Sequence, residues 1–185
     1  MELSALTPAL SRDFEALLRG ALREIPHFPI SGILFKDISP LLARPGVLAA
    51  VVSAIEPIVA QLDVETVLAI DARGFVLGAA LADRLRAAFV MVRKPGKLPG
   101  EVQSFEYTCE YCSGRLEVSA GVVRRGMRCL VVDDLLATGG TARATADFAA
   151  SQGAIVIGFS FLLEIAALNR RERLKGAPVV TLLRC

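Results

Sequence analysis

The residues with the clearest chemical pattern are two adjacent carboxylates that precede a loop of small side chains. Asp133 and Asp134 directly follow the apolar run 129–132. The loop beyond them ends in small, hydroxyl and glycine residues, Ala137, Thr138, Gly139, Gly140 and Thr141. Glycines let a backbone approach an anion closely, threonines add hydroxyl donors, and the N–H groups that begin a following helix attract negative charge. We therefore expect this loop to bind a phosphate group.

The two acids need a different partner, because carboxylates repel a neighbouring phosphate. Ribose hydroxyls and a divalent cation such as Mg²⁺ are suitable partners for Asp133 and Asp134. The glycine patterns of dinucleotide-binding and ATP-binding loops are absent from the chain. A phosphorylated sugar bound together with Mg²⁺ fits both halves of the motif, and a strand end followed by an ordinary capped turn is the structural alternative.

Two arginines follow predicted strands in the same way. Arg73 follows the strand predicted to end near Asp71, and Arg93 follows the apolar run 88–92. Ligands of parallel sheets bind beyond the carboxyl ends of the strands, where a guanidinium can meet an oxygen-rich group. We expect both arginines at a binding site, with Gly74 allowing close approach of the backbone. A solvated surface charge is the alternative for each.

The apolar periodicity predicts an α/β fold of one domain, 1–185, in which helices flank a central parallel sheet. Buried strands are predicted over 66–70, 88–92, 129–132, 155–161 and 179–183. Helices are predicted over 11–24, 46–62, 74–86 and 141–151, with Ser11 as the first N-cap and Pro26 as the stop. The segment 28–40 is predicted to be a loop, and Pro57 is expected to kink or shift the second helix.

A long polar excursion interrupts this rhythm from Lys94 to about Arg125. It contains Gly96, Pro99 and Gly100 and alternates only weakly. Excursions of this length are often functional lids, and an ordinary β-hairpin is the alternative.

Composition and charge exclude several classes of protein. Hydrophobic residues make up 54% of the 185 residues and charged residues 22%, which excludes a disordered chain. The 21 basic and 19 acidic residues are dispersed, so nucleic-acid binding has no support. The longest uncharged segment, 148–163, is shorter than the roughly 20 apolar residues of a membrane span. The first residues lack a secretory signal, so we expect a cytoplasmic protein.

The four cysteines leave two alternatives open. Cys109 and Cys112 have the spacing of a redox pair or of half a zinc site. A complete zinc site needs two more ligands, yet Cys129 begins a strand pattern and Cys185 is terminal. We expect no protein metal site and favour free thiols in a reducing compartment.

The segment 131–141 resembles the phosphoribosyl pyrophosphate loop of the type I phosphoribosyltransferases. Three more segments are similar to the adenine-specific branch of that family: FPISGILFKDISPLL (28–42), DARGF (71–75) and RKPGKLPG (93–100). The resemblance extends from about residue 25 to residue 174. It implies the type I fold with a small N-terminal hood, about 1–40, and a flexible lid, about 94–125. It also implies transfer of a phosphoribosyl group from phosphoribosyl pyrophosphate to adenine, giving AMP and pyrophosphate.

The resemblance further implies a role for each matching residue. Arg73, Arg93 and Lys97 would bind pyrophosphate, with Mg²⁺ bound mainly through phosphoribosyl pyrophosphate, and Arg73 would be a catalytic residue as well. The loop 137–141 would hold the 5′-phosphate, and Asp133 and Asp134 the ribose. The adenine site would comprise four residues: the backbone of Leu34, the side chains of Phe35 and Ile165 on the faces of the base, and Lys36 in a position where some members carry Arg.

The lid would carry the acid–base pair Glu110 and Tyr111, with Glu110 exchanging the proton of the purine's imidazole nitrogen. Cys112 stands where the family commonly has Gly, which bears on the lid conformation. An unusual backbone geometry at Ala72–Arg73 and a homodimer are implied as well. The alternatives are an enzyme for another purine (hypoxanthine, guanine or xanthine) and a regulator that senses phosphoribosyl pyrophosphate.

Overall fold

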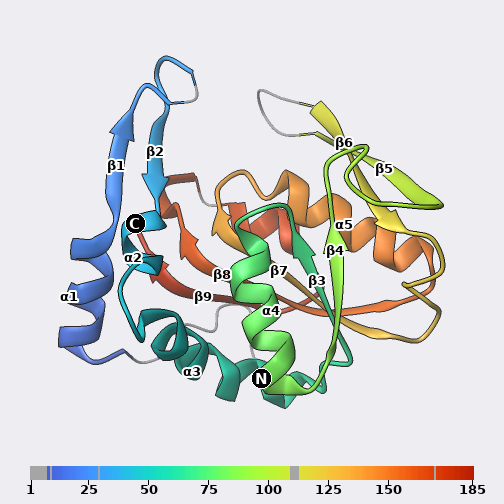
Figure 1. Cartoon of the computed structure of the whole chain (residues 1–185), viewed down its shortest axis with the longest axis horizontal. Helices are drawn as coiled ribbons and strands as arrows, with labels where there is room; N and C mark the ends of the chain where they lie inside the picture. Colours follow the sequence, from blue (N-terminus) through green and yellow to red (C-terminus); the bar gives the residue numbers. More distant parts are fainter. Residues whose placement is uncertain (1–7, 9, 29, 109–112, 169) are drawn as a thin grey trace.

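A five-stranded parallel sheet forms the centre of the computed structural model, which describes residues 8, 10–28, 30–108, 113–168 and 170–185. The strand order is β4-β3-β7-β8-β9. The strands are β3 (Thr66–Ile70), β4 (Ala88–Val92), β7 (Arg128–Leu136), β8 (Ile155–Glu164) and β9 (Val179–Arg184). Every neighbouring pair is parallel, which confirms the predicted fold class and brings all five carboxyl ends to one edge (Figure 1).

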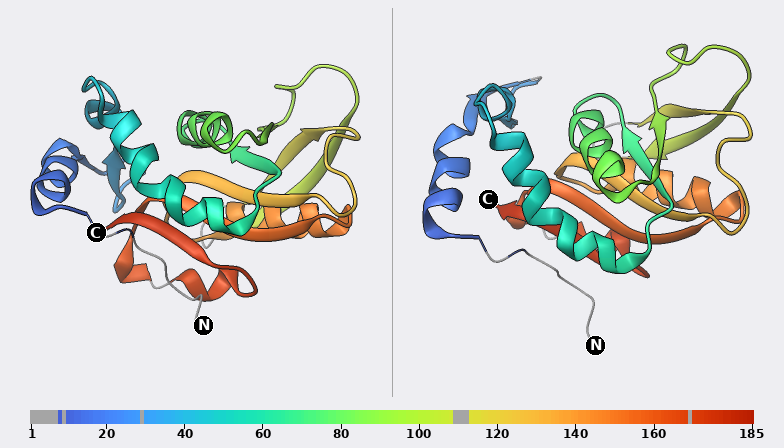
Figure 2. Two further views of the ribbon diagram at one scale, coloured as in Figure 1. Left: turned by 90° about the horizontal axis from the view of Figure 1, so that it is seen from below. Right: turned by 60° about the horizontal axis from the view of Figure 1, so that its bottom comes forward.

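Helices cover both faces of the sheet and bury its apolar residues in two cores (Figure 2). α3 (Val47–Val59) and α4 (Gly74–Leu85) pack on one face, where Val51 and Leu81 meet Val67 and Leu130. α5 (Gly140–Ser151) packs on the other face. Pro57 lies in the last turn of α3, and the chain continues as a 3-10 turn, Ala60–Leu62, so the predicted helix 46–62 is kept.

The N-terminal hood contains more structure than the sequence predicted. α1 (Arg12–Ala21) is capped by Ser11, whose side-chain oxygen accepts the Phe14 N–H at 3.2 Å. The helix ends at Ala21 rather than Glu24, because an antiparallel pair follows. β1 (Arg23–Pro26) pairs with β2 (Leu34–Asp37), inside the predicted loop, and a short helix, α2 (Ser39–Leu42), comes next. Both strands have four residues, too few for a clear alternation.

The polar excursion contains the β-hairpin that was the alternative to a lid. β5 (Val102–Thr108) pairs with β6 (Ser113–Ser119). The Phe105 ring stacks on the Phe148 ring of α5 with centroids 4.5 Å apart, and the Gln103 amide donates to the Gln152 side chain at 2.8 Å. The base of the hairpin is therefore attached to α5.

One predicted boundary was wrong in a way that matters for the site. β7 runs to Leu136, not Val132, so Asp133 and Asp134 lie within the strand rather than after it. The strand continues because β8 pairs with it as far as Glu164. None of the helices in the described part of the chain is long and apolar enough to cross a membrane.

Candidate active site

The carboxyl ends of the parallel strands bring together residues from distant parts of the chain. Asp71 follows β3, Arg93 follows β4, the two acids lie near the end of β7, and Ile165 follows β8. The β1–β2 and β5–β6 hairpins rise on opposite sides of this edge (Figure 1). Most of the side chains that were predicted from their position at strand ends therefore lie at one edge of the sheet.

Arg73 connects the sheet to the hood. Its Nε lies 2.8 Å from Asp134 Oδ2, and its guanidinium carbon lies 4.8 Å from the centroid of the Phe35 ring. Gly74 explains how Arg73 comes so close to β7, since a Cβ there would lie 2.9 Å from Asp133 Oδ1 and 3.0 Å from the Val132 carbonyl oxygen. The unusual backbone geometry expected at Ala72–Arg73 lies one bond earlier, where the peptide bond between Asp71 and Ala72 is cis.

The two carboxylates are arranged for a partner that supplies protons or positive charge. Asp133 Oδ1 accepts the Asp134 N–H at 2.8 Å. Burial, followed by the charge of Asp134, raises the pKa of Asp133 well above its usual value. Asp134 Oδ2 is buried and receives no aligned hydrogen bond from the described residues, so its contact with Arg73 is an ion pair only. Hydroxyl donors or a cation would satisfy both groups.

The small-residue loop has the geometry of an anion site. Gly139 has φ of 73°, a left-handed conformation that favours glycine, and α5 starts at Gly140 without a side-chain cap. Its first N–H groups therefore point outward for a ligand. A cavity of about 70 Å³ adjoins the loop. It is lined by Asp133, Leu135, Leu136, Ala137, Thr138, Gly139, Thr141, Ala142 and Phe161.

Arg93 and Lys97 are joined through the backbone of the loop between them. Arg93 Nη1 donates to the Lys97 carbonyl oxygen at 2.9 Å, while its Nε lies 3.3 Å from Asp71 Oδ2. The Arg93 guanidinium also lies over the Phe75 ring, 5.7 Å from its centroid. Asp71 was missed by sequence reasoning, although an acid at a strand end beside Arg73 was a usable signal.

The hood residues predicted for the base lie on β2. Leu34 is exposed, and Phe35 packs edge-on against Phe28 with centroids 5.0 Å apart. Lys36 is paired with Glu24 on β1. Hydrogen bonds from Ser39, followed by those from Arg23, lower the pKa of Asp37 to about 2, so this carboxylate anchors the end of β2.

Ile165 is placed beside the phosphate loop. Its N–H donates to the Leu136 carbonyl oxygen at 3.0 Å. The preceding residue, Glu164, is buried and accepts hydrogen bonds from Arg171 and Thr181. Burial alone would raise the pKa of Glu164, but the hydrogen bond and charge of Arg171, the charge of Arg184 and the hydrogen bond of Thr181 together lower it.

Glu110 and Tyr111, and with them Cys109 and Cys112, lie outside the described residues. Within the ranges that are described, no group of three or more His, Cys, Asp or Glu side chains could hold a metal ion by itself. Cys129 and Cys185 are free thiols, and burial raises the pKa of Cys129 to about 11.

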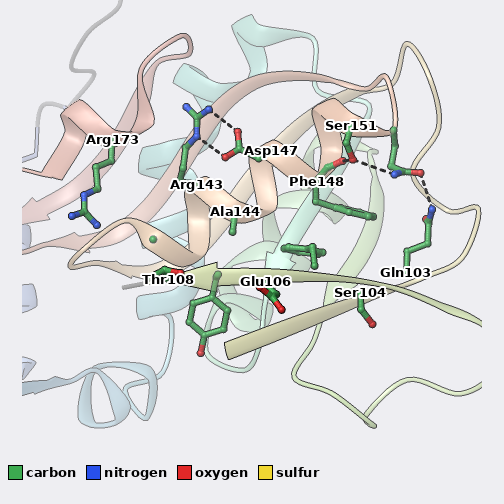
Figure 3. A pocket seen from close by; sticks show the side chains of 14 residues that line it. Gln103, Ser104, Glu106, Thr108, Arg143, Ala144, Asp147, Phe148, Ser151 and Arg173 are labelled. Carbon is green, nitrogen blue, oxygen red and sulfur yellow. Dashed lines mark hydrogen bonds and ion pairs between the residues drawn. The ribbon is translucent and has the colours of Figure 1, made fainter. Parts of the chain in front are cut away.

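A larger groove, of about 800 Å³, lies between β5 and α5 (Figure 3). Arg143 and Asp147 form an ion pair along its α5 wall, and Glu106 comes from its β5 wall. Of the predicted site residues, Gly140 is shared between this groove and the phosphate loop. The groove is thus separate from the edge where Arg73 and the carboxylates meet.

Comparison with known proteins gives consistent results. The model of the phosphoribosyl transferase domain family matches residues 38–182. Adenine phosphoribosyltransferase 2 of Rhizobium etli is 60% identical over 165 residues, 89% of this chain and 90% of its own length. The adenine phosphoribosyltransferase of Synechococcus sp. strain CC9605 is 47% identical over 90% of this chain and 98% of its own.

Solved structures are similar over nearly the whole chain. Adenine phosphoribosyltransferase from Rhodothermus marinus superposes with a TM-score of 0.88 at 39% identity, covering 95% of this chain and 100% of that one. The Saccharomyces cerevisiae adenine phosphoribosyltransferase, in a complex with an imino-altritol bisphosphate and adenine, gives 0.82 at 34% identity, covering 92% of this chain and 99% of that one.

Proposed function

The chain belongs to the phosphoribosyl transferase family, in its adenine-specific branch, and we propose how its own residues carry out the reaction. The enzyme transfers the 5-phosphoribosyl group of phosphoribosyl pyrophosphate to adenine, giving AMP and pyrophosphate. A bond forms between C1′ and the adenine nitrogen while the bond from C1′ to the pyrophosphate oxygen breaks. The observation that carries this assignment is the 60% identity over 89% of the chain.

The loop 137–141 binds the 5′-phosphate. The left-handed Gly139 and the uncapped start of α5 support this role, because they direct N–H groups and the positive end of the helix dipole outward. The ribose then lies beside Asp133 and Asp134, whose oxygens accept its two hydroxyls. This partner would relieve both the raised pKa of Asp133 and the missing hydrogen bond of Asp134.

The leaving pyrophosphate is held by Arg73, Arg93 and Lys97. Negative charge builds on this group as the bond to C1′ breaks, so fixed cations lower the barrier. Arg73 and Arg93 are each held by a carboxylate and an aromatic ring, which restricts their guanidiniums before the substrate arrives. Mg²⁺, bound mainly through phosphoribosyl pyrophosphate, would add positive charge at the same oxygens. Asp134 Oδ2, which is ion-paired with Arg73 but accepts no hydrogen bond from the described residues, is compatible with such a complex.

Adenine binds between the hood and the end of β8. The backbone of Leu34 reads the polar edge of the base, while Phe35 and Ile165 pack against its faces. The exposure of Leu34 and the cleftward contact of Phe35 with Arg73 support this arrangement. Lys36 contributes positive charge from β2, where its present partner is Glu24.

Glu110 acts as the acid–base residue and Tyr111 accompanies it on the lid. Adenine must lose the proton of its imidazole nitrogen when the new bond forms, and a carboxylate in a dehydrated site can accept it. β5 and β6 rise beside the sheet edge, and this position supports the role of the segment 94–125 as a lid (Figure 1).

We also infer a homodimer that forms across the outer edge of the sheet. β4 is an edge strand, and Phe89 and Met91 on it are 38% and 40% exposed; Val76 of α4, the helix that packs on β4, is 38% exposed as well. Exposed edge strands with large apolar side chains are usually covered. The expected mass of the wild type in solution is twice the chain mass, and Met91→Asp should lower it to that of one chain. A wild-type monomer would contradict the dimer, and a dimer that Met91→Asp leaves intact would contradict this interface. For the compartment we infer the cytoplasm, in keeping with the free thiols.

Pyrophosphate release tests the proposal directly. The enzyme is supplied with phosphoribosyl pyrophosphate, Mg²⁺ and each of adenine, hypoxanthine, guanine and xanthine in parallel. Release with adenine alone is the expected result. Release only with a 6-oxopurine would keep the phosphate and ribose sites and overturn the base site, and no release with any base would favour a sensor of phosphoribosyl pyrophosphate.

A further inference from the structure

Glu117 is a buried carboxylate that connects the hairpin to the loop carrying Lys97. It lies on β6 and is 9% exposed. Its backbone forms a bridge with Arg93, with the Arg93 N–H donating to the Glu117 carbonyl oxygen at 2.8 Å and the Glu117 N–H donating back at 2.7 Å. The hairpin is thus attached to the end of β4 at the residue proposed to bind pyrophosphate.

The side chain of Glu117 makes a second connection. Its Oε2 accepts the Gly96 N–H at 2.9 Å, and Gly96 has φ of 71°, the left-handed conformation of a tight turn. A hydrogen bond from an amide to a carboxylate is stronger than one between neutral groups, so Glu117 holds this turn in place. The loop then returns to Arg93, whose Nη1 donates to the Lys97 carbonyl oxygen at 2.9 Å.

The loop is therefore fixed at both of its sides. Glu117 holds Gly96 from the hairpin, and Arg93 holds Lys97 from the end of β4. The Lys97 side chain starts from a backbone position that these two contacts define. A long flexible ammonium chain needs such a defined start to reach one oxygen of a ligand repeatedly, because orientation contributes much of the effect of a binding group.

We propose that Glu117 is a positioning residue for the pyrophosphate group, acting through the Gly96 turn on Lys97. The inference rests on the proposed role of Lys97 and extends it to a residue that does not touch the substrate. Glu117 then affects the binding of phosphoribosyl pyrophosphate and leaves adenine binding, which is proposed to involve β2 and Ile165, unaffected.

The test compares three substitutions of Glu117. Glu117→Met removes the acceptor, Glu117→Asp withdraws it by one methylene, and Glu117→Gln keeps a carbonyl oxygen that can accept the Gly96 N–H. We expect Met to raise the KM for phosphoribosyl pyrophosphate about 10-fold, Asp to raise it less, and Gln to leave it within about 2-fold of wild type. The KM for adenine stays within about 2-fold in all three. Glu106→Met, at an exposed position of β5, is the matched control with unchanged kinetics.

A double-mutant cycle with Lys97→Ala separates positioning from a general structural effect. If Glu117 acts through Lys97, Glu117→Met changes the KM by less than about 2-fold in the Lys97→Ala background. An undiminished effect in that background, an equal rise in the KM for adenine, or kinetics like those of Glu106→Met would each overturn the proposal. If Glu117→Met does not fold, the contrast between Asp and Gln decides.

Direct binding keeps this test independent of the activity. Pyrophosphate titrated with Mg²⁺ into wild type, Glu117→Asp and Glu117→Gln should bind more weakly to the Asp variant alone. A wild-type enzyme that binds pyrophosphate but releases none with adenine would refute the proposed function, and the ranking of the variants would still decide the role of Glu117.

Discussion

At the scale of single residues, the site works through shared partners. Arg73 is an ion-pair partner of Asp134 and a cation over Phe35, so one guanidinium touches groups proposed for ribose and for base. A planar guanidinium can satisfy a ring and a carboxylate together, whereas an ammonium is a compact point charge. The chemistry of the site therefore depends on Arg at this position and not merely on positive charge.

Arg73→Lys should lower kcat/KM for phosphoribosyl pyrophosphate by about 10²-fold, because a loss of roughly 2–3 kcal/mol of charge-assisted binding is expected in the transition state. Steady-state kinetics provide the measurement. Arg84→Lys is the control: Arg84 lies near the C-terminal end of α4 and pairs with Glu56 of α3, so its substitution should change kcat/KM little. Near-equal kinetics of the two variants would contradict the role of Arg73.

Asp133 should make ligand binding depend on pH. The pKa of Asp133 is raised in the folded state, so the native protein binds more protons than the unfolded chain between the ordinary aspartate pKa of about 3.8 and the raised value, and stability falls as pH rises through that window. Ribose hydroxyls or Mg²⁺ favour the ionised form, so binding of ribose 5-phosphate with Mg²⁺ should release a proton and tighten with rising pH in the same window. Calorimetry in buffers of different ionisation enthalpy measures the proton.

Asp133→Asn should remove this proton release, while Asp83→Asn, an exposed position on α4, should retain it. Proton release that persists at full size in Asp133→Asn would show that another group titrates.

At the scale of elements, the sequence was most informative where strands are short and apolar. The runs 66–70 and 88–92 match β3 and β4 residue for residue, because both are covered by α4 and end before the charged residues Asp71 and Arg93. β1 and β2 were missed since strands of four residues each are too short to show a clear alternation. β7 was predicted too short because Asp133 and Asp134 were interpreted as a strand end, whereas pairing with β8 continues beyond them. The partners of Arg73 come from tertiary packing, which no local pattern encodes.

The contact between α4 and β7 depends on Gly74. Gly74→Ala would place a Cβ within 3.0 Å of the β7 backbone, so we expect a loss of about 1–3 kcal/mol of stability and reduced activity as Arg73 moves from Asp134. Gly20→Ala is the opposite case, because that position in α1 has open space and helical backbone; it should be neutral or stabilise by up to about 1 kcal/mol. Chemical denaturation of both variants, with activity assays, provides the comparison.

At the scale of the whole molecule, a buried charge network closes the last strand onto the sheet. Glu164 on β8 accepts from Arg171 Nη2 at 2.6 Å and from Thr181 of β9 at 3.1 Å, and Arg171 also donates to the Val179 carbonyl oxygen at 3.1 Å. One carboxylate therefore joins β8, β9 and the segment between them, directly beside Ile165.

Arg171→Met should destabilise the protein by about 3–5 kcal/mol, since Glu164 would keep its burial and lose its main partner. Arg171 lowers the pKa of Glu164, so this pair contributes stability above the unfolded pKa and loses it as pH falls through the folded one. In Arg171→Met the loss of stability with falling pH should begin at a higher pH than in the wild type. Thermal melts between pH 7 and pH 4 measure both effects, and Arg84→Met, which removes an exposed arginine from its ion pair, is the control that should change stability little.

The stacking of Phe105 on Phe148 limits how far Glu110 can lie from α5. The helix whose first turn is proposed to bind the 5′-phosphate also packs against the base of the hairpin through these rings, so α5 fixes the proposed phosphate site relative to the base of the hairpin. Glu110 is five positions after Phe105, and the Cα atoms of residues five positions apart are at most about 18 Å from each other in a fully extended chain. The backbone of Glu110, the proposed proton acceptor, therefore stays within this distance of Phe105 while the two rings remain stacked. A base whose reacting nitrogen lies beyond the reach of the Glu110 side chain can be deprotonated by it only if the two rings separate.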